Sequence, residues 1–470
     1  MCDSHVIAGY LLNGNKHISM SIKHISIGYD SYLEYFTAVL NFLKDEQWIY
    51  NYRNTHILVN NVLDNFQPDW IEHFQYITSN ELNNLPFGYI NSNWPESLQN
   101  FLKKITNLKY GIEVYRFGSE LPVLQSRHRL SVKKQHEIVR LTAVIHDLCQ
   151  KYDITVIIDI GAGLGYLSYL LYEKYDYKIL AIEGNKDTYE LAIRNQEKYH
   201  ANTKEDIKFI HHFITNNSES NIRMLLENLN WSLNKICVTG LHACADLSIT
   251  ILDVFKKLEL AQSLAIMPCC YHRLEMSHVS ADGEMFENFP ISQVLSDVYE
   301  NLNGKLFLKK PFLRLACQQT ESAWKHMSDE DHAIHSKSCI LRAILQEFAN
   351  EENLKIERLK RKSGKLINNV KEYINNVKFT HKLIRPDGSD YVINEDVFLK
   401  TMMGKWKSYK DKCYLVEVLT AFQTAIQSIC ENIILLDRVQ YLSEKGIKCD
   451  IYKVTDDHIS PRCHALVANK

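Results

Sequence analysis

The fold is decided by one stretch of the chain, Thr155-Val156-Ile157-Ile158-Asp159-Ile160-Gly161-Ala162-Gly163-Leu164-Gly165. Its first six residues are mostly apolar and β-branched, which is typical of a strand that is buried on both faces of a parallel sheet. The glycines that follow allow a tight turn into the helix predicted over Tyr166–Tyr175. A strand, a glycine turn and a helix in this order predict an α/β domain.

The segments on either side continue this alternation of strand and helix. A helical pattern over Lys133–Gln150 precedes the first strand. Further strands are predicted at Lys178–Glu183, Ile207–Ile210, Ile236–Leu241 and Leu264–Met267. Helical patterns separate them, so the sequence predicts an open sheet with right-handed crossovers.

The rest of the chain predicts three further regions. The N-terminal part is helical in pieces, a long amphipathic helix runs from about Lys412 to Ser443, and two short strands after it predict a terminal hairpin. The predicted regions are residues 1–130 (helical), 131–272 (core, first part), 273–410 (insertion) and 411–470 (core, last helix and hairpin).

Composition narrows the class of protein. The chain has 470 residues, of which 46% are hydrophobic and 23% charged, so it has ample material for a globular core. Lys and Arg total 54 against 56 for Asp and Glu, which argues against a polyanion binder that uses its whole surface. The 12 cysteines are scattered, and neither a signal peptide nor a membrane span is evident. We therefore expect reduced thiols, no membrane contact, and a cytoplasmic or nuclear rather than secreted protein.

The glycine turn also predicts a cofactor site. Gly161, Gly163 and Gly165 allow a ligand to approach the backbone closely, and Asp159 is expected to fix the loop. Glu183 ends the next strand, 22 residues beyond Gly161, where a carboxylate accepts hydrogen bonds from both hydroxyls of a ribose. No residue pattern marks a pyrophosphate. S-adenosylmethionine therefore fits better than NAD or ATP, and the alternative is an ordinary glycine-rich turn.

Charged residues precede the first strand on the same predicted helix. Lys134, His136 and Glu137 are candidates for binding the carboxylate of the cofactor or for covering its pocket. A solvated helix start is the alternative.

Two clusters of reactive side chains end the fourth and fifth strands. The first is Gly240-Leu241-His242-Ala243-Cys244-Ala245-Asp246, and the second is Pro268-Cys269-Cys270-Tyr271-His272. Ligands of open α/β sheets bind beyond the carboxyl ends of the strands, so both clusters are expected beside the glycine loop. We take His242, Asp246, Tyr271 and His272 as candidate catalytic groups, and Cys244, Cys269 and Cys270 as candidate substrate contacts.

Three other interpretations of the clusters remain open. His242, Cys244, Cys269 and His272 have the ligand types of a zinc site, but their spacing is unlike the usual cysteine pairs, so no metal is assigned. In the second interpretation, Cys269 or Cys270 is the nucleophile of a covalent mechanism. In the third interpretation, the thiols are small buried hydrophobic groups.

A basic stretch lies inside the insertion. Nine lysines and arginines face two glutamates over Lys355–Lys382, a local net charge of +7. Lys360, Arg361 and Lys362 are its densest part and are candidate contacts for the phosphates of a nucleic acid. A solvated helix face is the commoner explanation of such a charge run.

These residues resemble a known family. Asp159–Ser168 and Glu183 are similar to the first two motifs of the class I S-adenosylmethionine-dependent methyltransferases. The fuller resemblance is to the methyltransferase-like protein 25 family, which includes a paralogue named for a ribosomal RNA adenine dimethylase domain. The matching segments are Trp94-Pro95-Glu96-Ser97-Leu98, Lys133-Lys134-Gln135-His136-Glu137, the glycine loop, Gly240–Leu247, Pro268–His272, Arg314–Gln318, Ile434–Arg438 and Ser460-Pro461-Arg462.

The resemblance implies a Rossmann-like, seven-stranded methyltransferase sheet with a terminal hairpin and an insertion before the last helix. The strand-end clusters are also similar to those of a transfer RNA ribose-methylating family, which favours RNA as the substrate. Ala245 departs from the pattern, because glycine is expected there. The chain also lacks the N-P-P-Y of many enzymes that methylate nucleobase amines, so adenine chemistry is not implied.

The sequence therefore predicts an S-adenosylmethionine-dependent methyltransferase that acts on RNA. The alternatives are a methyltransferase of protein side chains and a non-catalytic scaffold that retains the fold.

Overall fold

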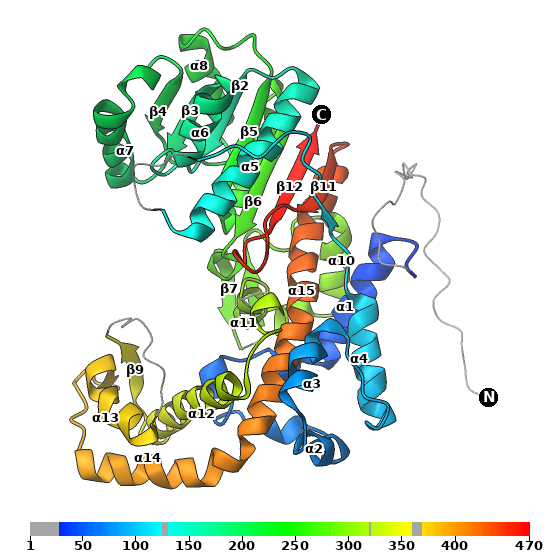
Figure 1. The fold of residues 1–470 in the computed structure, drawn as a ribbon, viewed down its shortest axis with the longest axis vertical. Helices are drawn as coiled ribbons and strands as arrows, with labels where there is room; N and C mark the ends of the chain where they lie inside the picture. The colour runs from blue at the N-terminus through cyan, green and yellow to red at the C-terminus, as the bar shows by residue number, and fades with distance from the viewer. Residues whose placement is uncertain (1–27, 125–129, 282, 319–320, 360–368) are drawn as a thin grey trace.

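A computed structural model describes residues 28–124, 130–281, 283–318, 321–359 and 369–470 of the chain. Figure 1 shows three regions: a sheet flanked by helices at the top, N-terminal helices packed around the long helix α15 below it, and an arm at the lower left. The arm contains β9, α13 and α14, and lies at the opposite end of the molecule from the sheet.

The main sheet has eight strands in the order β1-β11-β12-β6-β5-β2-β3-β4. β12 runs antiparallel to both of its neighbours, and the other strand pairs are parallel. The strands are β1 (Glu113–Val114), β2 (Val156–Ile160), β3 (Lys178–Glu183), β4 (Ile207–His211), β5 (Ile236–Cys244), β6 (Ala261–Cys269), β11 (Lys448–Lys453) and β12 (His464–Asn469). Seven of them, including the terminal hairpin, were predicted from the sequence.

The eighth strand, β1, corrects the predicted number of seven. It has two residues, both exposed, which pair in parallel with Tyr452 and Lys453 at the end of β11. A pair of residues is too short to show a periodic pattern, so the sequence carries no signal for it.

Helices cover both faces of the sheet, as the unbroken apolar strand requires. All five residues of β2 are buried. Ile157 packs into the apolar cluster that contains α5 and α6, whereas Ile158 packs into the larger cluster that contains α9 and α15. Alternate residues of one strand thus belong to two different cores.

The helices of this layered unit are α5 (Val132–Tyr152), α6 (Tyr166–Tyr175), α7 (Lys186–Tyr199), α8 (Glu219–Asn228) and α9 (Asp246–Lys257). α5, α6 and α7 contribute to the cluster on one face, and α8 and α9 to the cluster on the other.

The longest helix, α15 (Cys413–Ser443), joins the regions. Its C-terminal part packs against the sheet next to β11, and the remainder passes between the N-terminal helices toward the arm (Figure 1). Among the described residues, one helical run, Glu395–Ser443, is long and apolar enough to cross a membrane, but 78% of its qualifying window is buried inside the structure. Its apolar surface therefore belongs to the protein core.

The N-terminal helices pack their apolar side chains against α15. They are α1 (Tyr32–Asp45), α2 (Pro68–Phe74), α3 (Ser79–Asn84) and α4 (Glu96–Leu108). Phe422 of α15 lies with its ring centroid 5.0 Å from that of Phe101 and 5.9 Å from that of Phe74. α15 is thus a shared core element, and not an addition to the sheet alone.

Between β6 and α15 the described residues form a hairpin, the three α-helices α10 to α12, and the arm. The elements are β7 (Met276–Ser280), β8 (Gly283–Phe286), α10 (Gln293–Asn301), α11 (Lys310–Leu315), α12 (Asp329–Glu351), β9 (Lys355–Arg358), α13 (Val370–Thr380), β10 (His381–Ile384) and α14 (Glu395–Tyr409). β9 and β10 form a separate two-stranded sheet.

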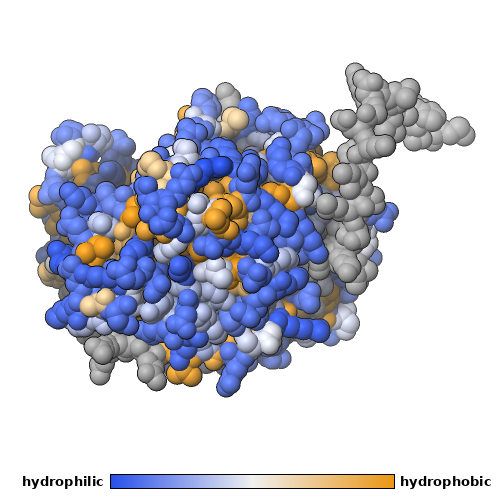
Figure 2. Space-filling model, turned by 90° about the horizontal axis from the view of Figure 1, so that it is seen from above, coloured by the Kyte–Doolittle hydropathy of each residue, from blue (hydrophilic) through white to orange (hydrophobic). Residues whose placement is uncertain are grey.

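Figure 2 shows the molecule from above the main sheet. Hydrophilic residues cover most of this face, and hydrophobic residues form small groups among them.

Candidate functional site

The candidate site lies where the strand order of the main sheet reverses. From β2 the chain continues through β3 and β4 in one direction, and β5 and β6 lie on the other side of β2. In open α/β sheets, the loops that follow the strands on the two sides of this point leave a crevice between them. Here those loops are the glycine loop after β2 and the reactive clusters after β5 and β6.

The glycine loop has the backbone conformation that glycine favours. Gly161, Gly163 and Gly165 have φ angles of 75°, 59° and 79°. A Cβ at Gly165 would lie 2.4 Å from the ring of Phe209, so this glycine is needed for packing. A Cβ at Gly163 would meet nothing within 4 Å. Gly163 therefore faces open space at the start of α6, which has no side-chain cap.

Asp159 fixes the loop to the helix that follows it. Its carboxylate accepts a hydrogen bond from the Ser168 hydroxyl of α6 at 2.7 Å, and its side chain is fully buried. Burial raises the pKa of Asp159 to about 6, against the opposing effect of the Ser168 hydrogen bond. At pH values between the ordinary pKa of 3.8 and about 6, Asp159 is therefore protonated in the folded chain and ionised in the unfolded chain.

Replacing Asp159 by asparagine is therefore expected to stabilise the fold at neutral pH. Ionised Asp159 is unfavourable in the folded chain, so stability falls as the pH rises from about 4 to 6. Asparagine is neutral throughout, and its gain at pH 7 is on the order of 3 kcal/mol. Denaturant unfolding of both proteins from pH 4 to 7.5 measures this gain, and a difference that does not change with pH would contradict it.

Glu183 closes the loop from the neighbouring strand. One carboxylate oxygen accepts the Gly163 N–H at 2.9 Å, and the other accepts the Asn185 N–H at 2.7 Å. The side chain of Phe213, which follows β4, lies against Gly184 and is 75% exposed. A fixed carboxylate beside an exposed aromatic ring forms a site with the features that a nucleoside requires.

Lys134 and His136 occupy different places at the start of α5. The Lys134 amine lies 4.5 Å from the ring centroid of Tyr166, the first residue of α6, and is therefore beside the glycine loop. The Nε2 atom of His136 accepts the backbone N–H of Asp456 at 2.9 Å, so its ring is used to hold the loop before β12. The structure thus places Lys134 nearer the loop than His136.

Glu137 binds His242 and not a cofactor carboxylate. Its side chain is 1% exposed, with Oε2 3.1 Å from Nε2 of His242 and Oε1 2.5 Å from the Ser460 hydroxyl. Burial alone would raise the pKa of Glu137, but the hydrogen bonds from His242 and Ser460 hold it below its usual range. An ionised, buried carboxylate that orients an imidazole is the arrangement that prepares a histidine to take a proton.

A bulge in β5 directs His242 toward Glu137. The pairing of β5 with β6 is irregular between Gly240 and Ala243. His242 has a positive φ of 59°, and Ala245, at the start of α9, has a φ of 48° and a ψ of −125°. Residues with a Cβ rarely adopt these conformations, so the strand end is strained.

Replacing Ala245 by glycine is expected to stabilise the protein by roughly 1 kcal/mol. Relief of 1–3 kcal/mol of strain exceeds the extra entropy that glycine has in the unfolded chain. Ala243→Gly in the same strand is the matched control, and should be destabilising because its alanine is fully buried. Equal losses of stability in the two variants would show that Ala245 is unstrained.

Two predicted catalytic residues hold the structure together instead. Tyr271 is 1% exposed, its hydroxyl donates to Glu431 at 3.0 Å, and the Arg438 guanidinium lies 5.2 Å from its ring centroid. Both carboxylate oxygens of Asp246 accept hydrogen bonds, from the Glu275 N–H and the Asn288 amide. Because Tyr271 is buried, its hydroxyl cannot contact a methyl acceptor. Asp246 instead anchors the β7–β8 hairpin.

His272 lies in the most cationic part of the site. Its Nδ1 is 3.0 Å from the Cys317 sulfur. Burial lowers its pKa, and the nearby charges of Arg314, Arg273, Arg462 and Lys310 lower it further. His272 is therefore neutral at pH 7. In the described parts of the chain, none of these four cations, which we name the His272 cation group, forms an ion pair with a carboxylate.

The three predicted substrate-contact cysteines lie close together. The sulfur atoms of Cys244, Cys269 and Cys270 are within 4.8 Å of one another, and those of Cys244 and Cys269 are 3.2 Å apart. Cys269 is buried, and the other two are half-buried. The histidines of the sequence-based zinc set have other partners, since His242 binds Glu137 and His272 contacts Cys317.

The basic stretch of the insertion is less cationic than the sequence indicated. Lys360, Arg361 and Lys362 lie outside the described residues. Lys355, Lys378 and Lys382 form ion pairs with Glu357, Glu395 and Asp390. Glu395 and Asp390 lie after Lys382 in the sequence. The net charge counted over Lys355–Lys382 therefore overstated the unpaired positive charge of this region.

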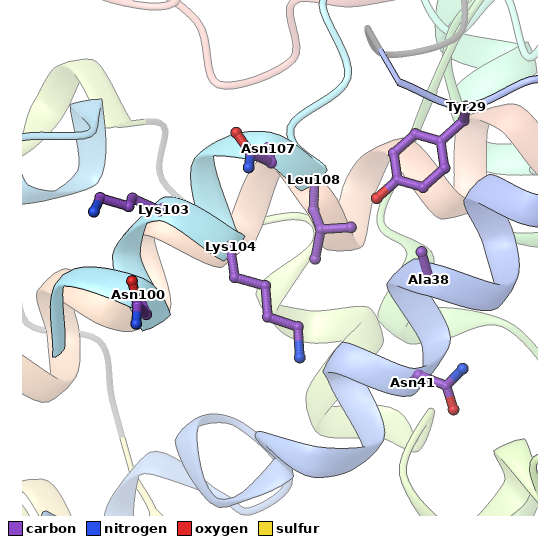
Figure 3. A pocket seen from close by; sticks show the side chains of 8 residues that line it. All are labelled: Tyr29, Ala38, Asn41, Asn100, Lys103, Lys104, Asn107 and Leu108. Atoms are coloured by element: carbon purple, nitrogen blue, oxygen red, sulfur yellow. The ribbon is translucent and has the colours of Figure 1, made fainter. Parts of the chain in front are cut away.

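Two cavities in the described residues differ in their suitability as a substrate site. One of about 430 Å³ lies beside the His272 cation group, lined by Cys317, Gln318, Ala323, Asp457, His458, Ile459, Pro461 and Arg462. Another of about 470 Å³ lies between α1 and α4, and Figure 3 shows Lys104 and Tyr29 directed into it. This second cavity has no nucleophile or base near the strand ends, so the smaller one is the better candidate.

Residues from distant parts of the sequence complete the site. Glu431, Arg438, Ser460, Arg462 and Cys317 were not assigned roles from the sequence. Four of them lie within the segments on which the family resemblance rests, but their partners are 45 to 323 residues away in the chain. Membership of those segments was the sequence feature that could have identified these residues. Their contacts could be found only from the folded structure.

The comparisons with known proteins agree with this geometry. A family model described as a methyltransferase domain matches residues 133–277, which include the glycine loop and both strand-end clusters. Two curated proteins, each named probable methyltransferase-like protein 25, from Mus musculus and Homo sapiens, are 25% identical over 266 residues. The match covers 55% of this chain and 40% of each relative.

Solved structures give only distant matches. A coclaurine N-methyltransferase bound to N-methylheliamine and SAH aligns over 93% of this chain and 96% of its own, at 10% identity and a TM-score of 0.23. A likeness this weak supports no conclusion about the present chain. The domain match shows that the chain carries a methyltransferase domain on a Rossmann-like sheet, and the curated relatives show that this chain is similar to the methyltransferase-like protein 25 family.

Proposed function

We propose that the chain is an S-adenosylmethionine-dependent methyltransferase that acts on RNA. The observation that supports this cofactor is the open space around Gly163, next to the carboxylate of Glu183, which backbone hydrogen bonds hold in place. A nucleoside in this place has its ribose hydroxyls at Glu183 and its base over exposed Phe213. Lys134 is close enough to the loop to pair with the carboxylate of the amino acid part.

The residues of the strand ends would then act on the acceptor. Bound S-adenosylmethionine supplies an electrophilic methyl group. His242, oriented by Glu137, takes the proton that an acceptor hydroxyl or amine loses. His272, neutral at pH 7, lies on the cationic side of the site and positions the acceptor.

The His272 cation group supports RNA as the acceptor. Arg273 and Arg314 are exposed and Arg462 is half-buried, beside the cavity of about 430 Å³. Cations without carboxylate partners are suited to phosphate oxygens, and guanidinium groups bind them through paired hydrogen bonds. This contact lies at the strand ends and is therefore closer to the reacting atoms than the arm.

Transfer of a labelled methyl group into lysate tests the proposal. The full chain with labelled S-adenosylmethionine is added to lysate that lacks the endogenous protein, and the product is treated with nuclease or protease. We expect label that nuclease releases and protease does not. Label released only by protease would establish a protein substrate, and no label above that of heat-treated protein would favour the scaffold alternative.

Two triple variants locate the RNA contact. The first replaces Arg273, Arg314 and Arg462 by glutamine, and the second replaces Lys360, Arg361 and Lys362. The first is expected to lower the slope of log affinity against log salt by about 2, because each lost phosphate contact removes about 0.7 for single strands. An unchanged slope in the first variant and a reduced one in the second would assign the contact to the basic stretch of the insertion instead.

A further inference from the structure

The three cysteines at the strand ends form a compact sulfur cluster. Cys244 and Cys269 are register partners on the adjacent parallel strands β5 and β6, which brings their side chains together. Their sulfur atoms are 3.2 Å apart, and that of Cys270 lies within 4.8 Å of both. Cys244 and Cys269 are the last residues of β5 and β6, and Cys270 follows β6 directly, so the sheet positions the cluster.

Backbone strain brings the third sulfur to the cluster. Consecutive residues of a strand point to opposite faces, so Cys269 and Cys270 would not ordinarily share a site. Cys270 has a φ of 56°, which ends the strand and turns its side chain toward its neighbour's. A residue with a Cβ adopts this conformation at a cost, and such costs concentrate at functional sites.

Two arginines place positive charge beside the cluster. The charge of Arg273 acts on the Cys244 sulfur. The charge of Arg462 acts on both Cys269 and Cys270. Neither arginine is neutralised by a carboxylate in the described residues.

We propose that Cys244, Cys269 and Cys270 bind a zinc ion through three thiolates. Thiolate sulfur is a preferred ligand of zinc, and three protein ligands with one open position are the pattern of sites that act on a bound molecule. Binding releases the protons that remain on the thiols and leaves a net charge of −1, facing Arg273 and Arg462. The proposal does not depend on the cofactor or on RNA.

Metal content tests the site directly. The full chain is produced in zinc-supplemented medium, purified without chelators and analysed for metal by mass spectrometry. We expect one zinc per chain, its loss when all three cysteines are replaced by serine, and its retention in Cys317→Ser. Cys317 is the matched control, because it is a buried thiol beside His272 and outside the cluster. Zinc-free wild-type protein after dialysis against zinc, or zinc retained in the triple variant, would overturn the proposal.

A spectroscopic measurement avoids the risk that the triple variant fails to fold. Cobalt(II) is added to the metal-free wild-type chain, and absorption is recorded in the near ultraviolet and the visible. Three thiolates in a four-coordinate site are expected to give sulfur-to-cobalt charge-transfer bands and intense visible bands at one equivalent. Cobalt bound without charge-transfer bands, or a Cys244–Cys269 disulfide in protein purified under reducing conditions, would contradict the site.

Discussion

Replacing Gly163 by arginine is expected to weaken binding of S-adenosylmethionine by more than about 100-fold without unfolding the chain. No atom lies within 4 Å of a Cβ at this position, so the side chain meets no steric clash, and the positive φ of 59° adds only local backbone strain. The arginine then fills the space that the nucleoside needs. A 100-fold loss corresponds to about 2.7 kcal/mol. Calorimetric titration measures it.

Gly446→Arg is the matched control for this prediction. Gly446 also has a positive φ, of 75°, and open space around its Cβ position, but it lies in the connection between α15 and the start of β11. Both variants therefore carry the same backbone strain, and only the first should lose the cofactor. Equal affinities in Gly163→Arg and Gly446→Arg would place the cofactor elsewhere.

Replacing His242 by asparagine is expected to lower kcat for methyl transfer by roughly 100- to 10,000-fold, with unchanged affinity for the cofactor. Loss of a positioned base has effects of this size. His73→Asn in α2, among the N-terminal helices, is the matched control and should retain activity. Single-turnover transfer of a labelled methyl group measures the rate, and a rate equal to that of the wild type would remove His242 from the reaction.

A double-variant cycle tests whether Glu137 acts through His242. Glu137→Gln retains the volume of the buried side chain but not its charge, so the imidazole loses its anionic partner. If Glu137 is a positioning residue, its replacement has little effect once His242 is asparagine. Additive losses in kcat would instead show that the two residues act independently.

The alternating core was predictable because its signal is local. The apolar run of β2 reflects burial of the strand on both faces. The three glycines reflect the positive φ angles of the turn that follows it. The terminal hairpin was predicted for the same reason. β1 was not, because its two exposed residues form a strand only through their pairing with β11.

The sequence predicted which residues lie in the site better than it predicted which of them bind one another. His242 and Glu137 were both named, but for separate tasks, since nothing local indicates that residues 105 positions apart share a hydrogen bond. Tyr271 has the chemistry of a catalytic group and was predicted as one. Its burial depends on Glu431 and Arg438 of α15, which the fold brings over it from 160 or more residues away.

Charge was the least predictable property of the sequence. The basic stretch of the arm appeared as the natural RNA contact, but acids from outside it pair with Lys378 and Lys382. The His272 cation group is assembled from three separate segments, each with one or two cations. Charge density along the chain therefore differs from charge density in space.

Titration of the wild-type chain with S-adenosylmethionine is the decisive measurement for the proposed cofactor site. We expect one binding site per chain, displacement by S-adenosylhomocysteine but not by ATP or NAD, and loss of binding in Gly163→Arg but not in Gly446→Arg. A folded wild-type chain that binds no S-adenosylmethionine, or equal binding by the Gly163→Arg variant, would contradict the cofactor site.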